Sequence, residues 1–446
     1  MKFYNREDEL KDLNEIYIKS LDSSKMTIIM GRRRIGKTKL ILRFSEQMRL
    51  NNDVCSFIYL FVSKKEEQLL CDDFSIIIQE NLNVKIFGKI NNFAALFEYL
   101  MELSKNRNIT LVIDEFQEFF NINPSVFSEI QNIWDRYKDA AKMNLIFCGS
   151  MYSIMKKIFE NAKEPLFGRA NKKIILKHFN INILKQILND YNPSYSKKDL
   201  LSLYVFTGGT PRYLELFLDE KALNYKKMID VIFKKDSFFL NEGKDLLIEE
   251  FGKEYVVYFS ILSLMSNSKT SRGEIESYIG KEIGGYLNRL ENDYNIIKKV
   301  KPVFAKEGSK TQKYFIYDNF LNFWFRFIFK YKSAIEIENF NYVKKIVERD
   351  FDTFSGKYLE KYFKEKLEIS HKYSEIGSYW EKNNNNEIDI IAINKLEKKL
   401  LMAEVKINNN KINLEVLKNK SKRFFVKYPQ FKDWNIEYTG FSLDDI

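Results

Sequence analysis

A short glycine-containing segment near the N-terminus constrains the fold more than any other feature of the sequence. Residues 31–38 are Gly-Arg-Arg-Arg-Ile-Gly-Lys-Thr; they follow the apolar run 26–30 and lead into the amphipathic run 37–48. Glycines at this spacing let the main chain curl so that its N–H groups, and the N-terminus of the following helix, face phosphate oxygens. The sequence therefore predicts a phosphate-binding loop between a strand and a helix.

The residue types in this loop predict how a nucleotide is held. Lys37 supplies a point charge to the β- and γ-phosphates, and the Thr38 hydroxyl suits Mg²⁺. ATP and Mg²⁺ are therefore the expected cofactors. The alternative is a basic strand-to-helix turn without a ligand. The residues expected to bind the nucleotide here are Gly31, Arg32, Arg33, Arg34, Ile35, Gly36, Lys37 and Thr38.

A second segment, residues 110–115, is an apolar run that ends in two acids. We expect Asp114 to hold the metal and Glu115 to orient or deprotonate the attacking water, which favours hydrolysis over passive nucleotide binding. The alternative is an ordinary strand end with solvated acids. The apolar run that ends at Ser150 predicts a neighbouring strand, with Ser150, or less favourably Asn144, near the γ-phosphate.

The order of apolar segments predicts an α/β fold. Between residues 26 and 176, short β-type runs alternate with amphipathic stretches, which is typical of a parallel sheet with crossover helices. Residues 180–250 have a helical pattern, interrupted by Gly-Gly-Thr-Pro at 208–211. This segment suits a small helical lid that follows the sheet.

Composition limits the chemistry and the location of the protein. The 446 residues include 72 Lys and Arg against 61 Asp and Glu, and the net charge of +11 favours a polyanionic partner. His178 and His371 are the only histidines, which excludes a multi-histidine metal site. Cys55, Cys71 and Cys148 are odd in number and widely spaced, so neither a disulfide framework nor a CxxC zinc site is expected. The cysteine pattern favours a reducing, cytoplasmic location. The apolar stretches are too short to span a bilayer, so we expect a soluble protein without a membrane partner.

These motifs together resemble the archaeal-type ATPase family within the AAA+/STAND class. The resemblance implies an ASCE-type P-loop NTPase fold with a parallel sheet and a helical lid. The segments that carry it are 3–7 (Phe-Tyr-Asn-Arg-Glu), 9–10, 31–38, 111–118 (Leu-Val-Ile-Asp-Glu-Phe-Gln-Glu), 147–150, 165–169 (Pro-Leu-Phe-Gly-Arg) and 208–213.

The same resemblance implies further nucleotide contacts. Asn5 and Arg6 would pack near the adenine. Arg169 matches, by its order in the chain, a basic residue that reaches the γ-phosphate of a neighbouring subunit, so a homo-oligomer with shared sites is expected. The alternative for Arg169 is a surface or salt-bridged arginine. Arg212 is a candidate for sensing nucleotide in its own subunit.

The middle of the chain has the element order of a winged helix-turn-helix. Helical patterns at 255–265, 272–279 and 281–293 precede a segment, 296–317, with β-propensity at both ends. Residues 296–313 contain six lysines and one acid, so this expected wing is a candidate DNA-phosphate contact. The alternative is a structural or protein-binding module.

The C-terminal part contains an expected β-hairpin with two facing acids. The run 387–393 alternates in polarity, and 400–406 returns after a turn. A four-residue loop at 395–398 pairs Asp389 with Glu404 and puts Lys406 on the same face of the sheet. Directly opposed like charges are destabilising, so the arrangement favours a bridging cation or a functional reason.

This spacing resembles the PD-(D/E)XK nuclease superfamily, although Glu-Ile-Asp replaces Pro-Asp. The resemblance implies a restriction-endonuclease-like domain with Asp389 and Glu404 as Mg²⁺ ligands, Glu360 as an auxiliary acid and Lys406 near the hydrolytic water. An inactive domain or an ordinary charged hairpin are the alternatives. A basic cluster at 418–427 suits a nucleic-acid backbone or a solvated helix face.

The sequence thus predicts four parts: a P-loop ATPase domain (1–178), a helical lid (179–250), a winged helix (251–331) and a nuclease-like domain (332–446). The first functional hypothesis is an oligomeric ATPase that binds DNA and cleaves it in a Mg²⁺-dependent reaction. The second is a nucleotide-dependent switch or scaffold that binds a protein or nucleic-acid partner, with an inactive C-terminal domain.

Overall fold

The computed structural model describes residues 1–50, 56–306, 311–381 and 386–446. The chain forms two compact units, residues 2–177 and residues 178–446 together with Met1. Cys55 and parts of two expected loops, 307–310 and 383–385, lie outside the described residues. Among the described helices, none is long and apolar enough to cross a membrane.

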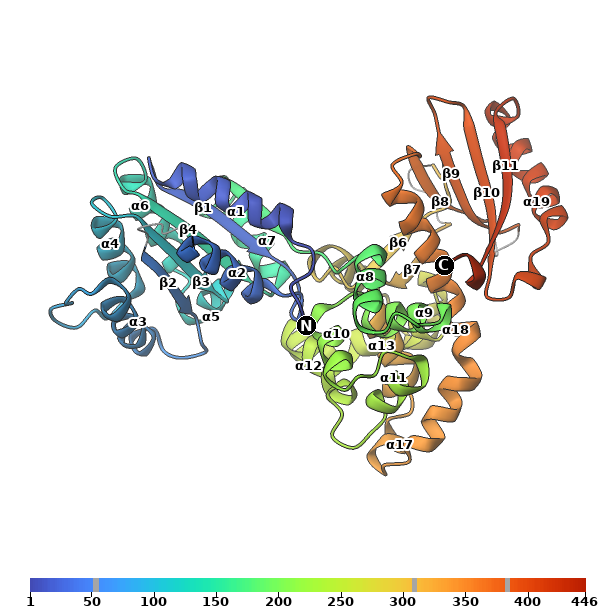
Figure 1. Ribbon diagram of the computed structural model, residues 1–446, viewed down its shortest axis with the longest axis horizontal. Helices are drawn as coiled ribbons and strands as arrows, with labels where there is room; N and C mark the ends of the chain where they lie inside the picture. The colour runs from blue at the N-terminus through green and yellow to red at the C-terminus, as the bar shows by residue number, and fades with distance from the viewer. Residues whose placement is uncertain (51–55, 307–310, 382–385) are drawn as a thin grey trace. The chain divides into compact units, whose positions relative to one another are not determined.

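The N-terminal unit is built on a parallel sheet of five strands in the order β2-β3-β4-β1-β5 (Figure 1), which confirms the predicted α/β architecture. The strands are β1 (Lys25–Met30), β2 (Ser56–Phe61), β3 (Ile109–Asp114), β4 (Met143–Gly149) and β5 (Lys172–Ile175). The helices are α1 (Glu7–Ser20), α2 (Lys37–Leu50), α3 (Glu67–Leu82), α4 (Phe93–Leu103), α5 (Phe119–Ile122), α6 (Val126–Tyr137) and α7 (Tyr152–Glu160), and a 3-10 turn, η1 (Phe116–Glu118), follows β3.

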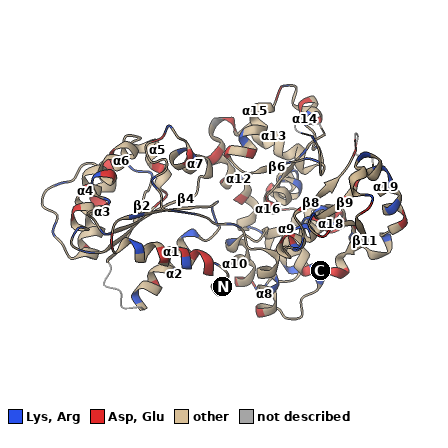
Figure 2. Cartoon of the chain, turned by 90° about the horizontal axis from the view of Figure 1, so that it is seen from above, with Lys and Arg blue, Asp and Glu red and all other residues tan. Residues whose placement is uncertain are grey.

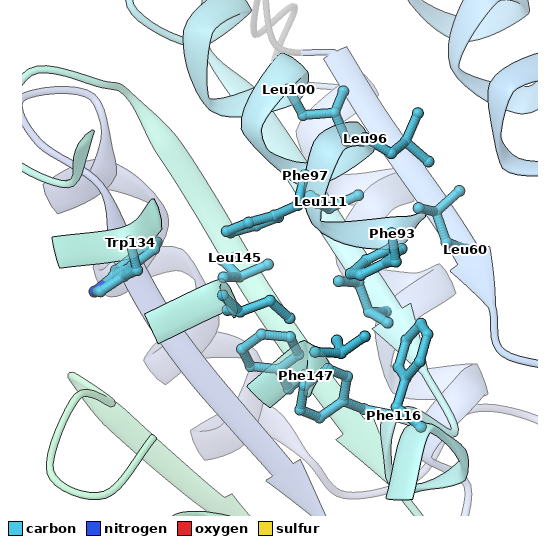
Figure 3. Close-up of a cluster of buried hydrophobic side chains, with 14 of the residues drawn as sticks. Leu60, Phe93, Leu96, Phe97, Leu100, Leu111, Phe116, Trp134, Leu145 and Phe147 are labelled. Atoms are coloured by element: carbon cyan, nitrogen blue, oxygen red, sulfur yellow. The ribbon is translucent and has the colours of Figure 1, made fainter. Parts of the chain in front are cut away.

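Alternate side chains of the sheet supply two apolar cores. On one face, β-strand residues pack with α1 and α2. On the other, a larger aromatic cluster joins the sheet to α3, α4 and α6; Figure 3 shows Phe116 and Phe147 within it, and their rings stack with centroids 4.0 Å apart. Because all five strands run the same way, their carboxyl ends meet at one edge, where Gly31 follows β1 and Asp114 ends β3.

The C-terminal unit begins with a helical segment: α8 (Ile181–Tyr191), α9 (Lys197–Thr207), α10 (Pro211–Asp219), α11 (Tyr225–Ile232), α12 (Phe238–Phe251) and the turn η2 (Gly252–Glu254). Gly208 ends α9 in a left-handed conformation, and Pro211 starts α10, so the Gly-Gly-Thr-Pro sequence breaks the helical pattern as the residue types predict.

Three helical segments and a two-stranded hairpin follow: α13 (Tyr255–Ser266), α14 (Arg272–Ile279), α15 (Gly284–Asn288) with η3 (Arg289–Asp293), then β6 (Ile297–Val300) paired with β7 (Lys313–Ile316). The third helix starts at Gly284, later than the predicted residue 281. Gly280 ends α14 in a left-handed conformation, and the Ile283 N–H donates to Glu276 Oε1 at 3.0 Å, so this stretch forms a turn.

The loop after β6 is part of the C-terminal core. Val303 is buried, and its N–H donates to the Ser378 carbonyl at 2.9 Å. The Phe304 ring stacks on Phe431, with centroids 4.9 Å apart. The described start of the expected wing therefore packs against the last part of the chain.

That last part is a four-stranded sheet in the order β11-β10-β9-β8 (Figure 1), in which β10 pairs antiparallel with β9 and parallel with β11. The remaining elements are α16 (Asn319–Phe323), η4 (Trp324–Phe329), α17 (Lys332–Glu336), α18 (Phe340–Ile369), β8 (Glu375–Tyr379), β9 (Ile388–Asn394), β10 (Lys399–Lys406), η6 (Asn409–Lys411), α19 (Leu414–Lys427), η7 (Pro429–Phe431), β11 (Asn435–Ser442) and η8 (Leu443–Asp445). The four-part division predicted from the sequence is finer than the two compact units and stays a prediction.

Candidate functional site

The phosphate-loop segment connects β1 to α2 with a tightly curled main chain. Arg34 and Gly36 both have positive φ angles, 70° and 92°. A Cβ on Gly31 would lie 3.0 Å from the Ile35 side chain and 3.2 Å from Leu176, closer than side chains usually pack, so the tight approach at this position favours glycine. Packing and backbone conformation therefore both contribute to the shape of the loop.

Lys37 lies at the first position of α2 and is 7% exposed. Its Nζ donates to the carbonyl of Gly31 at 2.8 Å and to that of Arg32 at 3.2 Å. These contacts hold the ammonium group against the loop without neutralising its charge, which suits an anion that approaches the loop.

Asp114, at the end of β3, is 3% exposed and faces α2. Its Oδ2 accepts a hydrogen bond from Thr38 Oγ1 at 3.4 Å and a second from the Tyr59 hydroxyl; its Oδ1 accepts from the Glu115 N–H at 2.9 Å. The structure therefore brings together the two residues, Thr38 and Asp114, that the sequence predicts as metal ligands.

Glu115 follows β3 with a left-handed backbone, φ 54°. A left-handed backbone is energetically unfavourable for a residue other than glycine, and such strained positions are frequent at functional sites. Its Oε2 accepts hydrogen bonds from Ser150 Oγ at 2.7 Å and from Gln117 Nε2. Ser150 thus lies beside Glu115, whereas Asn144 lies near the start of β4, opposite Lys25, far along the strand from this edge.

The N-terminal segment is joined to the same loop through Arg6. This side chain is buried; it donates to the Lys177 carbonyl at 2.6 Å and the Ile35 carbonyl at 3.5 Å, and pairs with Glu9 at 3.1 Å. Asn5 and Arg6 both have positive φ angles, 56° and 89°. Arg6 therefore fixes the N-terminal turn against the phosphate-loop segment, while a contact of Asn5 or Arg6 with adenine stays a prediction.

The two other predicted arginines have partners of their own. Arg169 contacts Asp135 through Nε at 3.1 Å and Nη2 at 2.7 Å, and donates to the Pro165 carbonyl at 2.6 Å. Arg212, at the start of α10 in the C-terminal unit, pairs with Glu215 at 3.5 Å. The salt-bridged alternative describes Arg169 in this chain, and a role of either arginine toward nucleotide stays a prediction.

The C-terminal hairpin has the predicted register. Lys399 pairs with Asn394, and the ladder continues to Ala403 opposite Ile390, one step before Glu404 and Asp389. The Val405 N–H donates to Asp389 Oδ2 at 2.8 Å. Asp389 and Glu404 therefore lie on facing strands, as expected from the loop length.

A lysine, rather than a metal ligand set, joins these two acids. Lys406 Nζ lies 3.4 Å from Asp389 Oδ2 and 3.3 Å from Glu404 Oε1, and Lys420 Nζ lies 3.7 Å from the same Glu404 oxygen. Glu360, on α18, pairs with Lys364 at 3.6 Å. In the part of the chain that the structure describes, no group of three or more His, Cys, Asp or Glu is arranged to hold a metal ion.

Charges couple Glu360 to this site. Burial raises the pKa of Glu360 to about 7; the charge of Lys364 opposes this shift, and the negative charges of Asp389 and Glu387 add to it. The pKa of Lys406 is also raised. Its partial burial lowers the pKa, but the charges of Asp389 and Glu404 raise it by more. The four predicted residues therefore share one electrostatic environment.

The sequence did not identify two residues that contact the acids at the nucleotide-site edge. Tyr59 comes from β2, and Gln117 from η1, where it is fully buried. A tyrosine inside the apolar segment 56–61 and an amide two residues after Glu115 are the available signals. Neither identifies its partner, because the pairing of β2 with β3 is a tertiary property.

The chemistry of the first site suits a magnesium nucleotide. The loop offers a curled main chain and the Lys37 ammonium for phosphates, and Thr38 and Asp114 offer the oxygen donors that Mg²⁺ prefers. Fold and site together define a P-loop ATPase domain.

Comparisons with known sequences agree with this class. A family profile described as an ATPase domain predominantly from Archaea matches residues 3–217, and one of archaeal and bacterial proteins of unknown function matches residues 324–423. An uncharacterized protein of Methanocaldococcus jannaschii is 30% identical over 416 residues, which cover 91% of this chain and 87% of that protein. The chain therefore belongs to the archaeal-type ATPase family.

Solved structures share the fold. The Walker-type ATPase of Pyrococcus abyssi has a TM-score of 0.53 at 18% identity; the match covers 73% of this chain and 96% of that one. The ORC2 protein of Aeropyrum pernix, solved in ADPNP and ADP complexes, has a TM-score of 0.50 at 12% identity, covering 76% and 95%. At these identities the likeness concerns the fold alone.

Proposed function

We propose that the N-terminal unit binds ATP with Mg²⁺ and hydrolyses it. The observation that carries the proposal is the shared edge of the sheet, where Lys37 and Thr38 at the start of α2 meet Asp114 and Glu115 at the end of β3. The ADPNP and ADP complexes of the Aeropyrum pernix protein support a nucleotide as the ligand of this fold.

Each residue has a role that its contacts support. The main chain of residues 31–36 and the Lys37 ammonium would hold the phosphates, while Thr38 and Asp114 would hold Mg²⁺, which neutralises charge on the transferred phosphoryl group. Glu115 would orient or deprotonate the water. Ser150 and Gln117 both donate to one oxygen of Glu115, so its other oxygen can accept from that water.

The test is ATP hydrolysis by Lys37→Ala, followed as phosphate release. We expect hydrolysis to be lost because the phosphates lose their buried cation. Lys19→Ala, an exposed lysine on α1, is the matched control and should hydrolyse ATP at the wild-type rate. Undiminished hydrolysis in Lys37→Ala would contradict the site assignment.

A second function, supported by the hairpin, is Mg²⁺-dependent cleavage of DNA by the C-terminal unit. The carboxylates of Asp389 and Glu404 both contact the ammonium nitrogen of Lys406. The charges of Asp389 and Lys406 also influence the pKa of Glu360. Two carboxylates and a lysine are groups with which a metal-dependent phosphodiesterase can work. In the wild type, Mg²⁺ would have to take the place that the Lys406 ammonium holds between the carboxylates.

Charge supports a nucleic-acid partner in part. Lys418, Lys422 and Arg423 are exposed along α19, whose basic positions Figure 2 shows in blue. Acids pair with basic residues in both places: Lys313 with Glu387 in the hairpin β6–β7, and Lys418 with Glu415 on α19. The Lys313 side chain is only 13% exposed, however, whereas those of Lys418 and Arg423 are 48% and 70% exposed. We therefore propose α19, more than the hairpin, as a contact for a DNA backbone.

Cleavage assays with supercoiled, linear and single-stranded DNA, with and without ATP and with Mg²⁺ or Mn²⁺, test this second function. Asp389→Asn and Glu404→Gln should lose cleavage and keep ATP hydrolysis, while Glu397→Gln in the exposed turn of the same hairpin should keep both. If the wild type cuts no DNA, the C-terminal unit is a binding module. The protein then acts as a nucleotide-dependent switch, and its oligomeric state should differ between ADP and ATP analogues.

A further inference from the structure

The hydroxyl of Tyr59 reaches the predicted metal ligands from a neighbouring strand. β2 pairs in parallel with β3, with Tyr59 opposite Val112 and Phe61 opposite Asp114. The Tyr59 ring packs against the apolar core between the sheet and helices α1 and α2. A ring held in this way fixes the position of its hydroxyl, which donates to Asp114 Oδ2.

The hydrogen bonds of Asp114 leave little freedom at its carboxylate. Oδ1 accepts from the Glu115 N–H, and Oδ2 accepts from the hydroxyls of Tyr59 and Thr38. The buried Cys148 thiol also hydrogen-bonds this carboxylate, so donors from several segments fix its orientation. The carboxylate is also almost fully buried, so a rotation would leave an oxygen without a donor.

We propose that Tyr59 is a positioning residue that holds the Asp114 carboxylate in the orientation in which, together with Thr38, it receives Mg²⁺. The proposal rests on the proposed nucleotide site and adds a residue that touches neither nucleotide nor metal. Groups that hydrogen-bond a ligating carboxylate commonly change metal affinity by about 10–100-fold when they are removed.

The test is the Mg²⁺ dependence of nucleotide binding in Tyr59→Phe, followed by fluorescence anisotropy of a labelled ADP. Phenylalanine keeps the ring and removes the hydroxyl. We expect the half-saturating Mg²⁺ concentration to rise at least about tenfold. Binding of labelled ADP in EDTA should stay at the wild-type value, since the phosphate loop is unchanged.

Tyr137→Phe is the matched control, because its hydroxyl contacts Glu98 at 3.2 Å at the end of α6 and not the nucleotide-site edge. An unchanged Mg²⁺ response in Tyr59→Phe, or a loss of binding in EDTA as well, would overturn the positioning role while the nucleotide site stands. A wild-type protein whose ADP binding ignores Mg²⁺ would overturn both the role of Tyr59 and the proposed metal site.

Discussion

The two candidate sites contain the same kinds of residues, but their lysines have different partners. At the nucleotide site, Lys37 donates to two main-chain carbonyls, and the carboxylates of Asp114 and Glu115 are held by neutral donors. At the hairpin, Lys406 lies directly between the carboxylates of Asp389 and Glu404.

This difference determines what each site can bind. A lysine held by neutral carbonyls keeps its charge for an anion, so the first site is prepared for phosphates. A lysine between two carboxylates has its charge compensated, so the second site is electrostatically satisfied without a ligand. A metal ion can enter the hairpin site only if it displaces the ammonium from the carboxylates.

The largest expected effect is at the nucleotide site. Glu115→Gln should reduce ATP hydrolysis by about 10²–10⁴-fold, because the water loses the carboxylate that activates it. Nucleotide binding should persist, since Lys37 and the loop are intact. Single-turnover phosphate release and labelled-ATP binding measure the two properties. Glu118→Gln changes a buried acid three residues later and is the control; equal losses in both variants would contradict the role of Glu115.

A smaller, pH-dependent effect is expected at the hairpin site. Burial raises the pKa of Glu360 from 4.5 to about 7, so the folded state holds this proton more tightly than the unfolded state. The stability that this proton provides is complete below about pH 4.5 and is lost as the pH rises toward 7. Glu360→Gln should therefore be more stable than the wild type by about 2 kcal/mol at pH 8, with little difference at pH 4.5.

Urea unfolding followed by tryptophan fluorescence at the two pH values measures this difference. Glu368→Gln, an exposed acid on the same helix, should show no such dependence. A stability gain for Glu360→Gln that is equal at both pH values would show that the pKa of Glu360 is the same in the folded and unfolded states.

Contacts between neighbours in the chain could be predicted from the sequence, whereas contacts between distant segments could not. The loop 31–38 and the strand ends were predictable because they depend on neighbours in the chain, and the hairpin register followed from loop length alone. The contact of Tyr59 with Asp114 joins residues 55 positions apart, and it depends on β2 lying beside β3. The packing of Val303 and Phe304 depends on a sheet that forms later in the chain, so the sequence did not reveal that the start of the expected wing packs against it.

Removal of the hairpin lysine should have a moderate effect. Lys406→Met leaves two facing carboxylates without their shared cation, and we expect a loss of about 1 kcal/mol at low salt, limited by the partial exposure of Lys406. High salt should reduce the loss, because ions screen the repulsion. Urea unfolding at two salt concentrations measures it, with Lys432→Met, at an exposed lysine after η7, as control. A salt-independent loss would indicate that packing of the lysine stem dominates.

The smallest effect is expected for Arg169, whose ion pair with Asp135 is partly exposed at 23% and 39% of the two side chains. Arg169→Ala should lower stability by about 0.5 kcal/mol at pH 7. The Arg169 contact lowers the pKa of Asp135, so this contribution is present at neutral pH and lost in acid as the carboxyl group is protonated. Thermal unfolding of Arg169→Ala and Asp135→Ala should therefore show shifts at pH 7 that decrease toward pH 2, and Arg169→Ala should keep the part that comes from its hydrogen bond to the Pro165 carbonyl.

ATP hydrolysis by the same two variants decides between the two roles of Arg169. If Arg169 has a structural role, both variants hydrolyse ATP as the wild type does, because the contacts of Arg169 with Asp135 and with the Pro165 carbonyl stabilise only local structure. If Arg169 reaches the nucleotide of a neighbouring subunit, it must first leave Asp135, so Asp135→Ala should hydrolyse ATP at least as fast as the wild type while Arg169→Ala loses activity. The loss would then depend on protein concentration, since a shared site exists only in the assembled oligomer.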